Sequence, residues 1–222
     1  MWVNERIDGA DFSRIVRKSR NALKRILDLL ISVSLLVFTA PLMLLVAILI
    51  MCESNGPALY RQERVGSKGS RFTLLKFRSM NQDAEPEGKP VWASPGDARV
   101  TRVGRLIRST RIDELPQLFN VLRGEMSMVG PRPERPYFVD QLTEVVPSYA
   151  ERHNVKPGIT GWAQVNYPYG ASIEDARRKL EYDLHYVNHI NTRLDLRILC
   201  ATVGVGSWVK GQDDSRDAIA RY

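Results

Sequence analysis

The chain has 222 residues, 44% of them hydrophobic, and a formal net charge of +7. This length predicts one domain with at most an appended membrane element, and the absence of internal repeats and low-complexity tracts excludes repeat architectures. The charge favours an anionic partner: a phosphate substrate, nucleic acid or a phospholipid surface. Cys52 and Cys200 lie far apart in apolar stretches, which indicates a reducing compartment rather than a disulfide.

The first 28 residues form a basic N-terminal segment. Between Phe12 and Leu27 there are six basic residues and no acidic residue, with apolar residues between them. This pattern predicts a basic amphipathic helix at a membrane surface. A solvated, charged helix is the alternative.

Residues 29–52 follow as an apolar run of 24 residues without a charge, roughly 36 Å of helix, which is enough to span a bilayer. The run starts too late and is too long for a signal peptide. Pro41 lies in its middle, where it removes a helix hydrogen bond, and both flanks are basic. We therefore favour a re-entrant membrane helix, broken at Ala40-Pro41, that enters and leaves by one face. A spanning helix is a close alternative, and a buried core helix is a third.

Two short strand-like segments, 58–66 and 71–80, are separated by the turn-like residues 67–70. This arrangement predicts a β-hairpin. Under strict alternation Lys76 and Arg78 project to one side of the second strand, as an anion clamp would require. Edge-strand charges that prevent aggregation are an equally good explanation. Residues 81–98, which include Trp92, are rich in proline, glycine and acids and are expected to form a loop.

A helix with Thr101 as its cap is expected next, because apolar residues keep helical spacing over 103–110. Arginines recur at every third residue from 99 to 111, a spacing that spirals around a helix and forms no single face. Of these, only Arg108 and Arg111 lie close to the acidic pair that follows.

Asp113 and Glu114 lie at a predicted helix start, with Pro116 in the first turn and Gly124 as a stop. The exposed N–H groups of such a turn attract anions. With Arg108 and Arg111 upstream, the two carboxylates can hold a divalent metal and present a nucleophile to a phosphate. Ordinary helix capping by an acidic pair is the alternative. Downstream, a rigid basic turn offers a second phosphate contact: Gly130, Pro131, Arg132 and Pro133.

The C-terminal third predicts further helices. One is expected over 138–146, another over 173–190 with a capping box at Ser172, and an apolar helix over 194–209 that lies in the core or the interface plane. The glycine-bearing loop over 156–164 could let backbone approach a ligand, although it has neither Walker nor Rossmann spacing. His185 and His189 are one turn apart, but no third ligand is evident, so surface histidines are favoured over a metal site. The fold class expected is α+β and mostly helical, with a small hairpin, amphipathic interfacial helices, and a catalytic domain over 53–222.

Six motifs in combination carry a resemblance from about Lys24 to Trp208. They are Lys24-Arg25-x-x-Asp28, Tyr60 to Gly66, Lys76 to Met80, Asp113 to Gln117, Val129 to Pro133, and Lys156 to Trp162. With these motifs the chain resembles the bacterial sugar transferase family, the monotopic phosphoglycosyl transferases. Further stretches at 91–93, 133–136 and 167–172 look most like exopolysaccharide-initiating members.

The resemblance implies transfer of a sugar 1-phosphate from a UDP-sugar to undecaprenyl phosphate, with release of UMP. It assigns the nucleophile to Asp113, Mg²⁺ binding to Glu114 with Asp113, phosphate binding to Arg108, and nucleotide binding to the turn from Pro131 to Pro133. It also implies a location on the cytoplasmic face of the bacterial inner membrane, against phospholipid. Homo-oligomerisation and the identity of the sugar are left open by the sequence.

Two departures from the family pattern stand out. Many relatives break the membrane helix at Ser-Pro, whereas Ala40-Pro41 stands here, and longer relatives carry further N-terminal elements, so a short form or a fragment is expected. The competing function is a catalytically inactive membrane scaffold that binds anionic lipids or assembly partners. The intact Asp113-Glu114 pair argues against it, because a scaffold needs no acids inside a basic site. A nucleic-acid binder is weaker still, since no recognised module is present.

Overall fold

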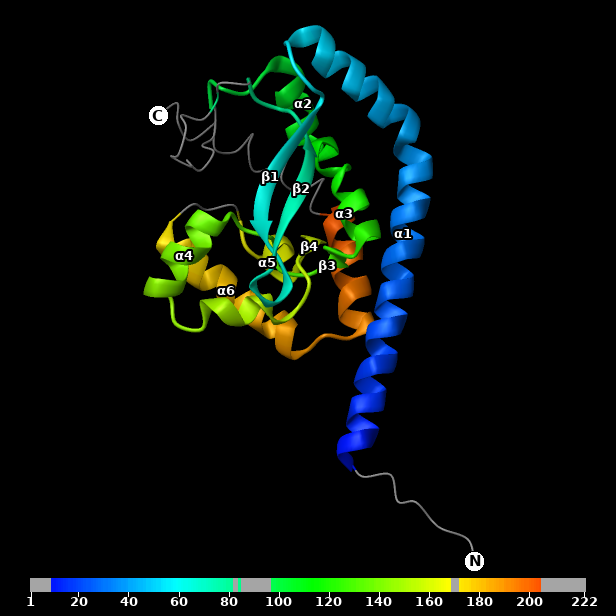
Figure 1. The fold of residues 1–222 in the computed structure, drawn as a ribbon, viewed down its shortest axis with the longest axis vertical. Coiled ribbons are helices and arrows are strands. Elements are labelled where there is room, and N and C mark those ends of the chain that lie inside the picture. The colour runs from blue at the N-terminus through cyan, green and yellow to red at the C-terminus, as the bar shows by residue number, and fades with distance from the viewer. Residues whose placement is uncertain (1–8, 82–83, 85–96, 169–171, 205–222) are drawn as a thin grey trace, which may run out of the picture.

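One long helix lies along a globular unit (Figure 1). The computed structural model describes residues 9–81, 84, 97–168 and 172–204, with side chains from residue 21 onward, so Trp92 and most of the expected loop over 81–98 lie outside the described residues. The long helix, α1, spans Gly9–Glu53. It therefore joins the predicted basic segment and the apolar run in one element.

Pro41 lies inside α1, so the expected break at Ala40-Pro41 is wrong as a break in the helix. The lighter blue, C-terminal part of α1 instead bends over the end of the globular unit (Figure 1). A proline removes one hydrogen bond and bends an axis without ending the helix when packing holds both sides. Here Ile31 and Leu36 pack on one core cluster, and Val46 and Ile50 belong to another.

The predicted hairpin is confirmed. Strands β1 (Leu59–Val65) and β2 (Arg71–Phe77) pair antiparallel, with Leu59 opposite Phe77 and Val65 opposite Arg71. The connection is a short 3-10 turn, Ser67–Gly69, in which Lys68 has a φ of 55° and Gly69 a φ of 75°.

A second, parallel pair was not predicted. Strand β3 (Ser127–Val129) pairs with β4 (Gly158–Thr160), so part of the glycine-bearing loop is a strand. The glycines allow two backbones to meet: a Cβ on Gly158 would lie 2.1 Å from the amide nitrogen of Gly130. These glycines therefore serve contact between two chain segments, whereas the sequence had indicated contact with a ligand.

The remaining helices follow the predicted order, except that α5 (Trp162–Asn166) begins inside the stretch 156–164, for which a loop was predicted. They are α2 (Arg102–Ser109), α3 (Gln117–Arg123), α4 (Pro136–Val145), α5, α6 (Ile173–Asn188) and a last helix over 192–204. Thr101 caps α2, Gly124 ends α3 with a φ of 83°, and Ser172 and Asp175 form the capping box of α6. These local signals were read correctly from the sequence.

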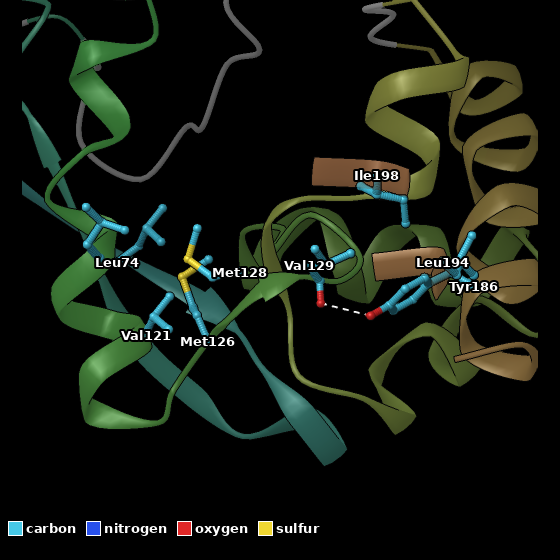
Figure 2. Close-up of a cluster of buried hydrophobic side chains, with 9 residues drawn as sticks. Leu74, Val121, Met126, Met128, Val129, Tyr186, Leu194 and Ile198 are labelled. Atoms are coloured by element: carbon cyan, nitrogen blue, oxygen red, sulfur yellow. Dashed lines mark hydrogen bonds between the residues drawn. The ribbon is translucent and has the colours of Figure 1, made fainter. Parts of the chain in front are cut away.

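The main core joins these elements. Leu74, Val121, Met126 and Met128 pack at one side of the cluster, and Val129, Tyr186, Leu194 and Ile198 pack at the other (Figure 2). The Tyr186 hydroxyl donates to the Val129 carbonyl over 3.0 Å, which ties α6 to β3. The helix predicted over 194–209 is confirmed for its described part, and of its two predicted places, the core and the interface plane, Leu194 and Ile198 occupy the core.

The first part of the apolar stretch of α1 is bonded to the globular unit. Arg25 donates to the carbonyls of Val121 and Leu122 over 2.7 and 3.0 Å, at the C-terminal end of α3, where a cation is favoured. The buried Asp28 carboxylate accepts from the Ser127 hydroxyl over 2.8 Å and the Met128 amide over 3.0 Å.

The other end of α1 is bonded to the same unit. Arg78 donates to the carbonyls of Ser54 and Asn55 over 2.7 and 2.6 Å, and the Glu53 carboxylate accepts from the Arg102 amide over 2.7 Å. Both ends of the apolar stretch thus contact one globular unit.

Between those ends, the helix is long and apolar enough to cross a membrane, by length and composition, over Asn21–Glu53. Only 11% of its most apolar window is buried, which disfavours a soluble core helix. Large apolar side chains remain exposed along it, including Leu30, Phe38 and Leu44.

Candidate active site

The acidic pair lies in a tight reversal between two helices. After α2 ends, Arg111 adopts a left-handed conformation with a φ of 57°, and a 3-10 turn, η2 (Ile112–Glu114), carries both carboxylates. Pro116 then caps α3. The pair therefore lies in a 3-10 turn just before α3, whereas the sequence predicted it at the start of that helix. Both residues are buried.

Glu114 is the anion at the centre of a basic cluster. Its Oε1 atom accepts from Lys76 Nζ over 3.3 Å and from Arg132 Nη2 over 2.7 Å. The three side chains come from β2, η2 and the loop after β3. The structure thus brings together three of the residues predicted for the site.

Asp113 contrasts with its neighbour, because it makes no hydrogen bond or ion pair with the part of the chain that the structure describes. Burial raises the pKa of its carboxyl, and the charges of Lys76, Arg132 and Arg108 offset part of that increase. A buried carboxylate beside cations but bonded to none of them is available to an incoming group.

The pKa values of Glu114, Lys76 and Arg132 are shifted in different directions by burial and by one another's charges. Burial alone would raise the pKa of Glu114, but the Arg132 and Lys76 charges, together with the Arg132 hydrogen bond, hold it well below its ordinary value. Burial lowers the pKa of Lys76 despite the attraction of Glu114. Glu114 raises the pKa of Arg132, whose side chain remains 36% exposed. Arg132 is therefore a permanent cation that solvent or a ligand can reach.

Arg108 and Arg111 flank the pair without bonding to it through their side chains. Arg108 lies in the last turn of α2 and lowers the pKa of Asp113, and Arg111 lowers that of Glu114. Their charges reach the site, while their side chains remain partly or fully exposed. Both guanidinium groups are therefore accessible to a phosphate bound beside the acidic pair.

Arg78 does not join Lys76. Strand β2 ends at Phe77, and the Arg78 guanidinium binds the carbonyls at the end of α1. Lys76 and Arg78 therefore bind different partners, the Glu114 carboxylate and the carbonyls at the end of α1, and an anion clamp made by both stays a prediction.

Pro131 and Pro133 flank Arg132, and both are buried. Two arginines that the sequence analysis did not assign to the site, Arg64 and Arg152, donate to carbonyls of this turn. Arg64 lies in the motif from Tyr60 to Gly66, which was the available signal. Arg152 stands in no such motif and could not have been found.

The carboxylate pair fits Mg²⁺ better than a transition metal. No group of three or more His, Cys, Asp or Glu residues that could hold a metal occurs within the described residues. Mg²⁺ needs no such cage, because it commonly binds one or two carboxylates and takes its other ligands from phosphates and water. The rings of His185 and His189 stack with 4.4 Å between their centroids. These two histidines lie at the end of α6, whereas the acidic pair lies in η2.

Comparison with known proteins gives a consistent result. The family described as "Bacterial sugar transferase" matches residues 19–208. A UDP-N-acetylgalactosamine-undecaprenyl-phosphate N-acetylgalactosaminephosphotransferase from Aeromonas hydrophila is 49% identical, over 82% of this chain and 43% of its own length. An undecaprenyl-phosphate glucose phosphotransferase from Komagataeibacter xylinus is 46% identical, over 81% of this chain and 35% of its own length.

A third relative is matched over more of its length. A UDP-glucose:undecaprenyl-phosphate glucose-1-phosphate transferase from Caulobacter vibrioides is 45% identical, over 81% of this chain and 68% of its own length. The chain therefore spans less than half of the first two relatives and about two thirds of the third.

Proposed function

Because this chain belongs to the bacterial sugar transferase family, we propose that it transfers a sugar 1-phosphate from a UDP-sugar to undecaprenyl phosphate and releases UMP. The observation that carries the proposal is the pairing of a buried Asp113, whose carboxylate is not bonded to any described residue, with a Glu114 held by two cations. The relatives' names state the same reaction class for those proteins. Their sugars differ between N-acetylgalactosamine and glucose, so the relatives leave the sugar of the donor open.

Asp113 acts as the nucleophile. Its carboxylate oxygen bonds to the β-phosphorus of the UDP-sugar while the bond from that phosphorus to the bridging oxygen breaks, and UMP leaves with the electron pair. The resulting acyl phosphate splits one transfer into two steps. A phosphate oxygen of undecaprenyl phosphate then attacks the same phosphorus, which restores the Asp113 carboxylate and forms the lipid-linked diphosphate sugar.

The cations around the pair bind and orient the phosphates. Arg132 combines a permanent charge with an exposed edge, and Lys76 lies on the same Glu114 oxygen. Arg108 lies near enough to Asp113 to lower its pKa, and its charge favours a phosphate beside the nucleophile. Asp113 and Glu114 would hold Mg²⁺, which when bound neutralises charge on phosphoryl oxygens.

The helix α1 supports a re-entrant membrane insertion at the cytoplasmic face of the bacterial inner membrane. Both ends of the apolar stretch bind a single globular unit, one end through Lys24, Arg25 and Asp28 and the other through Glu53. A helix that spanned the bilayer would place these two ends on opposite sides of the membrane. The exposed apolar side chains between them face away from that unit and fit lipid. Leu106 of α2 and Phe119 of α3 are also exposed, as interfacial helices would require.

Topology can be tested with single cysteines. Asn21→Cys and Asn55→Cys, each in a background with Cys52 and Cys200 replaced by serine, flank the apolar stretch. A re-entrant helix predicts that an impermeant maleimide labels both positions in inside-out vesicles and neither in right-side-out vesicles. Labelling of the two positions from opposite sides would establish a spanning helix instead.

The reaction can be tested by measuring UMP release. The assay offers a panel of UDP-sugars to the detergent-solubilised chain with undecaprenyl phosphate and Mg²⁺. We expect UMP with one donor, lost when the acceptor lipid and Mg²⁺ are both withheld. If folded protein releases no UMP from any donor, the catalytically inactive scaffold becomes the better explanation.

A further inference from the structure

The turn that carries Arg132 has few backbone hydrogen-bond donors of its own. Pro131 and Pro133 lack an N–H group, so the carbonyls of this buried turn need donors from elsewhere. Three successive carbonyls find them: that of Pro131 accepts from the Gly158 amide over 3.0 Å, that of Arg132 from Arg152 Nη2 over 2.9 Å, and that of Pro133 from Arg64 Nη1 over 3.0 Å. Two of the three donors are charged side chains.

Arg152 is fixed by partners that take no part in the proposed chemistry. Its Nε and Nη2 atoms donate to Asp183 Oδ2 over 3.0 and 2.7 Å, and its Nη1 atom donates to the Tyr149 hydroxyl over 2.9 Å. The side chains of Arg152 and Asp183 are 6% and 3% exposed. A buried ion pair is weak evidence of stabilisation, since desolvation offsets its attraction, so a role in fixing geometry is the better explanation.

Arg64 donates to the next carbonyl of the turn and is itself held by two partners. It forms an ion pair with Glu134 at 3.5 Å and donates to the Gln62 side chain, and its own side chain is 15% exposed. The Val65 amide also donates to the Glu134 carbonyl over 2.9 Å. Strand β1 is thereby fastened to the residue that follows Pro133.

We propose that Arg64 and Arg152 form a carbonyl clamp that positions the Arg132 guanidinium against Glu114, and that both are positioning residues for phosphate binding. The clamp holds the two carbonyls that follow the Arg132 Cα, those of Arg132 and Pro133, and the Arg132 side chain reaches Glu114 Oε1 at 2.7 Å. Its catalytic consequence rests on the proposed function, but its structural consequence does not. Without the clamp the Arg132 guanidinium is still present, but its orientation toward Glu114 is no longer fixed.

Arg152→Lys tests the clamp, because lysine keeps the charge beside Asp183 but lacks the fork that also reaches the Arg132 carbonyl. Tyr149→Phe is the matched control, since it removes the one partner of the same guanidinium that does not belong to the clamp or to its ion pair. Arg64→Lys probes the bond to the Pro133 carbonyl. All variants are full-length and in detergent, and their melting temperatures are measured first.

The first readout is hydrogen exchange at the Val65 and Gly158 amides, which donate to the Glu134 and Pro131 carbonyls of this turn. We expect faster exchange in Arg152→Lys and Arg64→Lys and wild-type exchange in Tyr149→Phe. This readout needs no substrate, so it tests the clamp even if the chain turned over no UDP-sugar. Unchanged exchange in both lysine variants would overturn the clamp.

The second readout is a double-mutant cycle with Arg132→Ala, measured as UMP release. Arg152→Lys should lower kcat/KM by roughly 10- to 100-fold, as small misplacements of a binding group do. In the Arg132→Ala background the same change should have almost no further effect, because the group being positioned is gone. An equal loss in both backgrounds would mean that Arg152 acts only on general stability, and would reject the positioning role.

Discussion

Asp113→Asn is expected to lower UMP release by about 10⁴-fold or more, the scale seen when a nucleophile is removed from an enzyme that works through it. The substitution keeps size and shape but removes the charged oxygen that, in the proposed mechanism, bonds to phosphorus. The wild type, incubated with the donor but no acceptor, should gain the mass of a phosphosugar on the peptide containing Asp113. The variant should gain none.

Folding should survive this change. Asp113 bonds to no side chain in the described part of the chain, and burial disfavours its ionised form. The raised pKa means that ionisation of Asp113 costs folding free energy as pH rises from the ordinary carboxyl value, about 3.9, through the folded value. Asp113→Asn removes that cost, so its melting temperature at neutral pH should equal or exceed that of the wild type. Substantial turnover by a well-folded variant would rule out Asp113 as the nucleophile.

Glu114→Gln has the second large expected effect, and it should reduce both activity and stability. Glutamine cannot neutralise Lys76 and Arg132, which share one oxygen of Glu114. We expect kcat/KM to fall by roughly 10²- to 10³-fold, the cost of removing a preorganised electrostatic group. The Mg²⁺ concentration for half-maximal activity should rise, because one of two carboxylate ligands is gone.

The stability effect separates this variant from Asp113→Asn. The free energy of unfolding should fall by up to about 3 kcal/mol, the low end for breaking a buried pair, because Arg132 stays partly exposed. The depressed pKa of Glu114 adds stability that is fully present above the ordinary value, about 4.3, and is lost as pH falls below it. The difference from wild type should therefore shrink on acidification.

Glu63→Gln is the control for a surface ion pair. Glu63 and Arg71 lie 3.4 Å apart with side chains 55% and 60% exposed, so water already screens them. Stability and activity should match the wild type. If Glu114→Gln behaved like this control in both measurements, Glu114 would not be the centre of the site.

Elements with a local signal were determined by the sequence alone. The turn between two strand-like segments specified the hairpin, Gly124 specified the end of α3, and Ser172 with Asp175 specified the start of α6. Asp113 and Glu114 could be identified as a pair because they are adjacent in the chain. The resemblance expected from about Lys24 to Trp208 agrees with the family match over residues 19–208.

Only the tertiary structure decided which side chains meet. Lys76 and Arg132 stand 38 and 18 residues from Glu114, and Arg152 stands 31 residues from Asp183, so no periodicity relates them. Strands β3 and β4 are too short to show alternation, and close backbone contact at Gly130 and Gly158 defines them.

Strand alternation placed Arg78 beside Lys76, but the end of α1 offered carbonyls that bind it more directly. The continuation of α1 through Pro41 in place of a break likewise follows from packing on both sides of the proline. Short-range chemistry thus fixed the elements that carry local signals and the position of the acidic pair. Contacts between distant segments fixed the charges around that pair, because burial and charge pairing depend on what lies opposite in space.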